Sequence, residues 1–229
     1  MKRAMLLLCL GGIAAPAWQP DLNMIRRLFE ESLARRQKEF GDADPRTAQA
    51  ARDLGNFLAT LPDRPAARRA LADAIRMDEK AFGGAAAQTL EDAASLAAIS
   101  PPAEAQALLR RAAESTDATI AGPALTSLAG LRKAAGDRTG AAALLKRAVG
   151  KAEAVDGKDG PTVALVLKEL AFVADPAEAV AALERALSID RQALGPRDAQ
   201  TLNDVHRLAA LLRQIGRGGE AAQLEQQFK

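Results

Sequence analysis

The sequence predicts an all-helical chain built as an α-solenoid, a row of antiparallel helix pairs. Three observations support this prediction. Apolar residues recur at helical spacing along most of the chain, Leu followed by a small residue returns at intervals, and glycine or proline separates the segments. The last unit is the clearest: a helix ends at Leu194, a corner follows at Gly195-Pro196, and a second helix ends at Ile215-Gly216.

Three markers locate this unit elsewhere; we call the first helix of each pair helix A and the second helix B. A Leu before a small residue marks helix A, a small residue opens helix B, and a Leu with a small residue three positions later marks the middle of helix B. Small side chains let two backbones approach closely, and pairs that bury one face must stack on neighbours. The helix A markers begin at Leu54, Leu96, Leu128, Leu170 and Leu208, and the helix B openers are Ala67, Ala105, Ala141, Ala179 and Ala221.

The distance between the first two markers alternates along the chain. Leu54 and Ala67 are 13 positions apart, whereas Leu96 and Ala105 are 9 apart. Four residues make about one helical turn, so the shortened helix keeps its inward face in the same direction. The second and fourth A helices are therefore predicted to be one turn shorter than the others.

The repeated unit resembles the tetratricopeptide repeat (TPR), in particular the longer kinesin-light-chain type. The matching residues include Ala186-Leu187, Leu194-Gly195, Thr201-Leu202, Leu208-Ala209 and Glu220-Ala221. The resemblance covers about residues 20–229. It departs from the family because most large aromatic residues of helix A are missing and the chain has no Tyr. The resemblance implies that the A helices line a concave groove that holds an extended peptide or a partner helix.

The markers and breakers predict one elongated domain over residues 18–229. It begins with a helix at 20–40 that has no partner in front of it. In this helix Leu28, Ser32, Leu33 and Phe40 are predicted to occupy the apolar and corner positions. About five A/B pairs are predicted after it, at 46–61 and 65–82, 88–99 and 103–120, 123–135 and 138–155, 161–174 and 177–194, and 199–215 and 218–229.

Residues 1–17 form a different kind of segment. Lys2 and Arg3 precede an apolar run from Ala4 to Ala15, and Ala15-Pro16-Ala17 supplies small residues where a signal peptidase reads them. We expect a cleaved signal peptide and hence a periplasmic or secreted protein. The alternative is that residues 4–17 remain as an N-terminal membrane anchor.

Composition argues against most other classes of function. Removing residues 1–17 leaves 29 basic against 29 acidic residues and no cysteine, so neither a nucleic-acid-binding stripe nor a disulfide is expected. His206 is the only histidine, and there is no Cys-x-x-Cys motif or phosphate-binding glycine loop after a strand. We therefore expect no catalytic residues, no metal, no cofactor and no small-molecule substrate.

The concave groove implied by the resemblance would be lined by polar residues that share the inward register of the helix A markers. Arg and Asn side chains there would bond to carboxylates and backbone amides of a peptide. The second A helix offers mostly Ala94 and Ala98, so a shallow middle is expected. The alternative is that these are ordinary solvated residues. The candidates are Gln49, Arg52, Asn56, Thr126, Lys133, Lys168, Asn203, His206 and Arg213.

Two classes of function follow from this sequence. The first is a non-catalytic exported adaptor that binds a protein or peptide partner in its groove. The second is a structural or assembly module that self-associates or docks through its ends. In that case the contacts would come from helix 20–40 and from Ala221, Ala222, Leu224 and Phe228 of the last helix.

Overall fold

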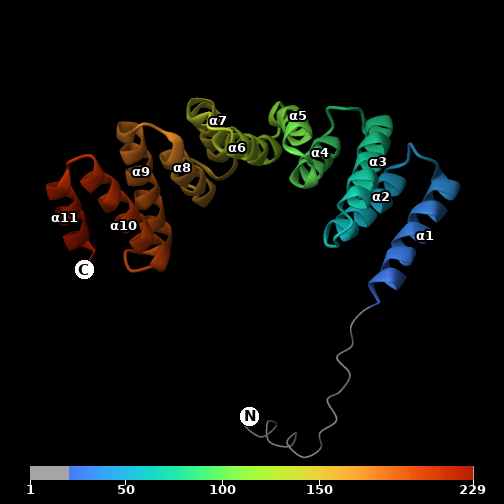
Figure 1. Cartoon of the computed structure of the whole chain (residues 1–229), viewed down its shortest axis with the longest axis horizontal. Helices are drawn as coiled ribbons and strands as arrows, with labels where there is room; N and C mark the ends of the chain where they lie inside the picture. The colour runs from blue at the N-terminus through green and yellow to red at the C-terminus, as the bar shows by residue number, and fades with distance from the viewer. Residues whose placement is uncertain (1–20, 229) are drawn as a thin grey trace, which may run out of the picture.

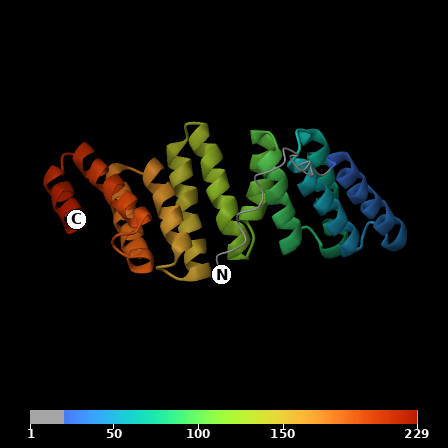
Figure 2. The same ribbon diagram turned by 90° about the horizontal axis from the view of Figure 1, so that it is seen from below.

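The computed structural model describes residues 21–228, and within this range the chain is entirely helical, with no strand. The helices form an arch that is curved in one view and a single row of rods in the perpendicular view (Figures 1 and 2). They are α1 (Leu22–Phe40), α2 (Pro45–Ala59), α3 (Arg64–Phe82), α4 (Ala87–Ile99), α5 (Pro102–Ala113), α6 (Ala118–Ala134), α7 (Arg138–Asp156), α8 (Pro161–Val173), α9 (Pro176–Leu194), α10 (Ala199–Gln214) and α11 (Gly218–Gln227).

The predicted helix pairs are α2/α3, α4/α5, α6/α7, α8/α9 and α10/α11, with α1 in front. Each helix packs mainly on the one before it and the one after it. In the middle of the arch α4 and α6 lie on the concave side, while α5 and α7 lie on the convex side (Figure 1). The two central A helices thus lie on the inside of the curve, as the resemblance to the tetratricopeptide repeat implies.

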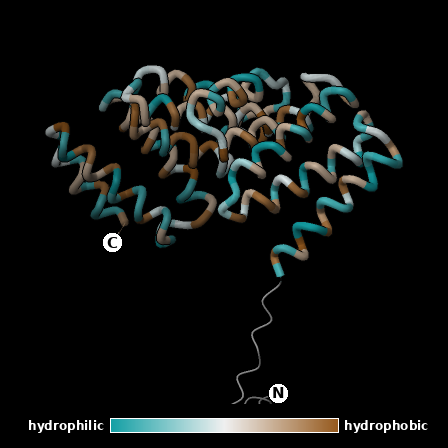
Figure 3. Tube along the Cα trace, turned by 45° about the vertical axis from the view of Figure 1, so that its right-hand side comes forward, coloured by the Kyte–Doolittle hydropathy of each residue, from teal (hydrophilic) through white to brown (hydrophobic). Residues whose placement is uncertain are grey.

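Small side chains set the distance between the helices of a pair. A Cβ atom placed on Gly55 in α2 would lie 2.7 Å from Leu71 Cγ and 3.0 Å from the Leu71 backbone nitrogen in α3. Alanines fill the corresponding interfaces, including Ala74, Ala112 and Ala148. Hydrophobic and hydrophilic residues are interspersed along the helices instead of gathering in one block (Figure 3), and α2 to α11 each bury part of their surface.

The long B-type helices end at corners that require glycine. Gly41 follows α1 and Gly83 follows α3, with φ values of 80° and 88°, in the left-handed region that other residues rarely adopt. A buried threonine closes each of these corners from the next helix. Thr47 Oγ1 donates to the Arg36 carbonyl at 3.3 Å, and Thr89 Oγ1 donates to the Gly83 carbonyl at 3.1 Å.

Most predicted helix bounds agree with the structure within two residues. The short A helices are confirmed, because α4 and α8 have 13 residues each, against 15, 17 and 16 in α2, α6 and α10. The boundary between the second B helix and the third A helix is wrong. The segment predicted as one helix over 103–120 ends at Ala113, and the next helix begins at Ala118 instead of at Pro123.

Local capping explains this error. Asp117 accepts a hydrogen bond from the Thr119 backbone N–H at 2.8 Å, which starts α6 five residues before Pro123. Pro123 therefore lies inside the helix instead of in its first turn. The α5 helix ends at Ala113 and is followed by Glu114, not by a glycine as α3 is, so this pair lacks the long B helix and the corner of the other units.

The two ends of the arch differ. In α1, Phe29 stacks on Phe57 of α2 at 5.2 Å between ring centroids, but Leu28, expected to face inward, is 58% exposed. In α11, Ala221 is fully buried, and Leu224 and Phe228 pack against the core formed by α9 and α10. The apolar side chains of the last helix are thus used within the chain, whereas α1 leaves some of its own uncovered.

The predicted signal segment, residues 1–17, lies outside the described residues. Within residues 21–228, no helix combines the length and the apolar character needed to cross a membrane.

Candidate functional site

The candidate site is the concave face formed by the A helices. Register places Gln49, Leu165 and Asn203 five residues before the Leu markers of α2, α8 and α10. All three are exposed. The positions two residues before the Leu markers differ in exposure. Two of the predicted groove residues at these positions, Arg52 and Lys168, have largely buried side chains.

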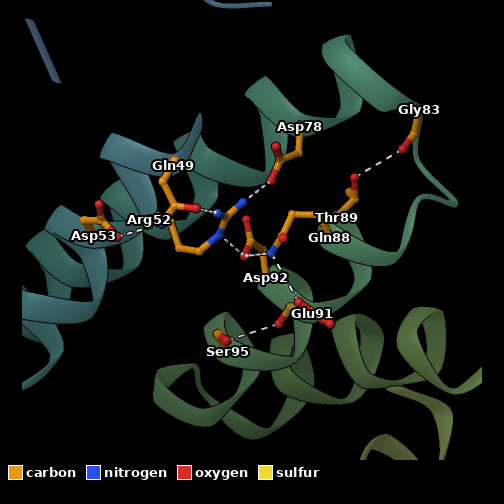
Figure 4. Close-up of polar contacts among 10 residues, drawn as sticks. All are labelled: Gln49, Arg52, Asp53, Asp78, Gly83, Gln88, Thr89, Glu91, Asp92 and Ser95. Atoms are coloured by element: carbon orange, nitrogen blue, oxygen red, sulfur yellow. Dashed lines mark hydrogen bonds and ion pairs between the residues drawn. The ribbon is translucent and has the colours of Figure 1, made fainter. Parts of the chain in front are cut away.

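Arg52 of α2 lies in a buried ion-pair cluster (Figure 4). Its guanidinium donates to Asp78 Oδ2 of α3 at 2.6 Å and to Asp92 Oδ1 of α4 at 2.5 Å. Its side chain is 12% exposed and each aspartate side chain 1%. Gln49 accepts a further hydrogen bond from Arg52 at 2.6 Å, and Gln88 approaches Asp92 at 3.5 Å. Arg52 therefore ties three helices together and is not available to a partner.

Lys168 of α8 repeats this arrangement at the other end of the arch. Its ammonium lies 2.5 Å from Asp190 Oδ2 of α9 and 3.0 Å from Asp204 Oδ2 of α10. The lysine side chain is again 12% exposed, and Asp204 is fully buried. Asp190 follows Lys168 by 22 residues, whereas Asp78 follows Arg52 by 26, because both α8 and the connection that follows it are shorter than α2 and its connection to α3. We call these two clusters the N-terminal triad and the C-terminal triad.

Each triad holds two carboxyl groups for one cation. Burial raises the pKa of Asp78 to about 6, helped by the neighbouring Asp92 carboxyl and opposed by the Arg52 charge. Burial likewise raises the pKa of Asp204, with Lys168 opposing the shift and Asp190 adding to it. Burial alone would lower the pKa of Lys168, but Asp190 and Asp204 raise it above its usual value.

The central units lack this chemistry at the same positions. The positions of Arg52, Asp78 and Asp92 correspond by register to Thr126 of α6, Ala152 of α7 and Val166 of α8. Ala152 and Val166 are buried, and the Thr126 hydroxyl donates to the Gly122 carbonyl of its own helix at 3.1 Å. The centre of the arch is thus joined by apolar packing at the level where both ends use ion pairs.

Exposed apolar side chains lie on the concave side of α8. Leu165 is 57% exposed and Phe172 is 54% exposed, and they are two turns apart on the same helix face. Cations from the flanking A helices approach the Phe172 ring: Lys133 Nζ of α6 lies 5.7 Å from its centroid, and the Arg207 guanidinium carbon of α10 lies 4.4 Å away. These contacts from both sides place Phe172 on the inner surface of the array.

The other predicted groove residues are spread along the same face. Lys133 pairs with Glu169 of α8 at 3.5 Å, and a hollow of about 30 Å³ there is lined partly by Thr126. Arg213 pairs with Glu225 of α11 at 2.6 Å, with both side chains partly exposed. Asn56, Asn203 and His206 are exposed.

The middle of the concave face is less flat than the sequence suggests. A recess of about 250 Å³ opens between α4 and α6, lined by Ala94, Ala98, Leu131 and other mostly small residues. The Ser100 hydroxyl lies at this recess, buried and without a hydrogen-bond partner. The small side chains of α4, expected to make the groove shallow, leave a depression instead.

Sequence reasoning missed Leu165, Phe172 and Arg207. The signal was present, because the marker Leu170 places Leu165 and Phe172 in the same register as Gln49 and Asn56. The residues predicted for the groove were all polar, so the apolar residues on this face were not among them. Among residues 21–228, no group of three His, Cys, Asp or Glu side chains is arranged to hold a metal ion.

Comparison with known proteins bears on the fold. No family model matches the sequence, and no curated protein matches it. The crystal structure of BtubC (BKLC) from P. vanneervenii is similar, with a TM-score of 0.71 at 17% sequence identity, over 92% of this chain and 90% of that one. The fold is a TPR-like α-solenoid.

Two further structures align with the solenoid at lower scores. A putative kinesin light chain from Podosopora anserina with nearly identical TPR-like repeats has a TM-score of 0.44 and 20% identity, covering 92% of this chain and 95% of that chain. A Rap protein complexed with competence and sporulation factor has a TM-score of 0.49 and 12% identity, covering 91% and 69%. The similarity to BtubC and the rows of helix pairs confirm the TPR-like fold expected from the sequence motifs.

Proposed function

We propose that this solenoid is an exported adaptor that binds a segment of a protein partner on its concave face and has no catalytic role of its own. The observation that supports it best is the exposed pair Leu165 and Phe172 on the inner side of α8. Exposed apolar groups beside polar ones are typical of interaction sites, because a partner that covers them removes apolar surface from water.

The surroundings of α8 indicate what the partner segment carries. Lys133 and Arg207 stand on either side of Phe172, and both contact its ring. A segment that places an apolar side chain on Phe172 therefore has cations within reach of a neighbouring carboxylate. The ion pair between Lys133 and Glu169 is half exposed, so exchanging it for a partner carboxylate costs little.

The first test compares two phenylalanines of similar exposure. Phe172→Ser removes the concave ring, whereas Phe82→Ser removes a ring that is 52% exposed at the end of α3. The partner is first captured by crosslinking to the mature protein in its native envelope or medium and identified by mass spectrometry. Its affinity for each purified variant is then measured by titration. We expect Phe172→Ser to weaken binding at least tenfold and Phe82→Ser to leave it unchanged.

Equal binding by the two variants would contradict concave binding at α8. A combined change of Arg52 and Lys168 is unsuitable for this test, because both cations are built into the buried triads and their loss would disturb folding.

Export is a separate part of the proposal and rests on the pattern of residues 1–17. We expect the mature protein to begin near Trp18 and to appear in the envelope or medium fraction. Intact-mass measurement of the native protein tests this. A mass that includes residues 1–17 in a membrane fraction would favour the anchored alternative, and one found in the cytoplasm would contradict export.

A second candidate function, docking through the end of the array, is favoured by α1. Leu22, Met24 and Leu28 are each about half exposed on this helix. The last helix offers less, because Leu224 and Phe228 pack inward. If α1 is the docking end, Leu22→Ser with Leu28→Ser converts an assembled form to a monomer in sedimentation velocity. Truncation at residue 221 would instead uncover the core at α10.

A further inference from the structure

The two triads differ from the other ion pairs of the described chain in their burial and their charge. Surface pairs such as Arg76–Asp73 are about half exposed and contain one charge of each sign. Each triad instead places two carboxyl groups and one cation at the junction of three helices. With every group ionised, each triad carries one uncompensated negative charge away from water, which is strongly unfavourable.

Hydrogen bonding in the triads is also incomplete. Asp78 Oδ1, Asp92 Oδ2 and Asp204 Oδ1 are buried without a hydrogen-bond partner, whereas Asp204 Oδ2 is paired with the Lys168 ammonium at 3.0 Å. An ionised carboxylate only accepts hydrogen bonds, whereas a protonated carboxyl group donates one. One proton in each triad therefore cancels the surplus charge and supplies a donor for a neighbouring oxygen.

We propose that the triads are proton-operated clamps, which tighten both ends of the solenoid in mildly acidic medium and loosen them at neutral pH. Proton uptake at the N-terminal triad strengthens the junction of α2, α3 and α4. Proton uptake at the C-terminal triad strengthens the junction of α8, α9 and α10. The central junction of α6, α7 and α8 carries no titratable group at the corresponding positions Thr126, Ala152 and Val166, so it does not respond.

The groups around Asp78 support this assignment. The charged groups that act on it are Arg52 from α2 and Asp92 from α4. Glu79, the next residue on α3, pairs with Arg111 of α5 at 2.6 Å and is half exposed. The charged groups that set the protonation of Asp78 therefore belong to the triad itself.

The C-terminal triad has the same isolation. Lys168 from α8 and Asp190 from α9 act on Asp204. The acidic residues of α11, which packs against α10, are paired elsewhere. Glu220 bonds to Arg217 and Glu225 to Arg213, each at 2.6 Å.

The direction of the pH effect follows from proton linkage. The folded chain holds a proton on Asp78 up to about pH 6, whereas the unfolded chain releases it near the ordinary value of 3.8. Folding therefore takes up a proton between these values, and stability decreases as the pH rises from about 4 through about 6. The partly or fully exposed carboxyl groups Asp44, Asp117, Asp137 and Glu220 have lowered pKa values, so their opposite effect lies below pH 4.5.

The clamps are connected to the candidate binding surface. Gln49, an exposed residue of the concave face, is hydrogen-bonded directly to Arg52, and Gln88 of α4 bonds to both Glu91 and Asp92 (Figure 4). A change in the charge of the N-terminal triad therefore alters the hydrogen bonds of Gln49 on α2 and of Gln88 on α4. The proposal concerns the solenoid itself and stands whether or not the concave face binds a partner.

The test is the pH dependence of urea unfolding of the full mature chain, followed by circular dichroism from pH 4.5 to 8. Asp78→Asn and Asp204→Asn keep the side-chain shape but cannot titrate. Asp73→Asn, on the exposed side of α3, is the matched control. The slope of unfolding free energy against pH gives the number of protons taken up on folding.

We expect the wild-type chain to take up about one proton at the N-terminal triad between pH 4.5 and 7, and to take up a further proton at the C-terminal triad because the pKa of Asp204 is also raised. Each triad variant should lose about one proton of this uptake, and the double variant should show none. Asp73→Asn should behave as wild type. If a single variant fails to fold, the triple variant Arg52→Thr, Asp78→Ala and Asp92→Val is used instead. It replaces the N-terminal triad with the uncharged residue types that occupy the corresponding positions of the central unit. No uptake by the wild-type chain, or full uptake by the Asp78 and Asp204 variants, would overturn the proposal.

Discussion

At the scale of single residues, register was predictable from the sequence and pairing was not. Counting from the Leu markers correctly put Arg52, Lys168 and His206 at the same level of their helices. Arg52 and Lys168 are paired with aspartates of the next two helices, and His206 is exposed. The buried partners of Arg52 are 26 and 40 residues away. Local spacing carries no information about such pairs, so a groove cation and a structural cation look alike in sequence.

Two glycines in A helices allow a direct test of the close-packing argument. A Cβ atom added at Gly55 would clash with Leu71, whereas a Cβ atom added at Gly130 of α6 would meet nothing within 4 Å. We expect Gly55→Ala to lower the free energy of unfolding by about 1–3 kcal/mol, because the helices of the pair must separate. We expect Gly130→Ala to raise it by about 0.5–1 kcal/mol, because alanine favours the helix. Chemical denaturation measures both, and a stabilising Gly55→Ala would show that the pair is not closely packed.

At the scale of elements, the sequence predicted most helices because their breakers are strong and local. A glycine with positive φ follows each of α1, α3, α7 and α9, and these glycines mark the helix ends in the sequence. The junction between α5 and α6 has no such glycine, and Pro123 suggested a helix start that the structure does not use. The start was set by Asp117, whose side chain caps α6. The N-cap at Asp117 therefore fixes the start of α6. Pro123 is accommodated inside the helix, although a proline there costs stability.

The cap on α6 gives a prediction at this scale. Asp117→Ala removes the acceptor for the Thr119 N–H, and we expect a loss of about 1 kcal/mol in unfolding free energy. Thr116→Ala, an exposed neighbour in the same turn, is the control and should change stability little. Hydrogen exchange should be faster in the first turn of α6 in the Asp117 variant. Unchanged exchange there would mean that Pro123 and not Asp117 fixes the start of the helix.

At the scale of the whole molecule, the arch follows from stacking helix pairs that each bury one face. The sequence predicted this row, its single domain and the concave placement of the A helices. Register also places Leu165 and Phe172 of α8 on this face, but the candidates taken from the sequence were all polar. The inner surface therefore combines polar and apolar positions that share one register, and the packed array shows that Leu165 and Phe172 are exposed there.

The central claim is that a partner binds on the inner surface around α8. The most direct measurement is hydrogen–deuterium exchange of the full mature chain with and without its captured partner. We expect slower exchange in α6, α8 and α10 and no change in α1. Protection confined to α1, or to the convex helices α5 and α7, would contradict the account.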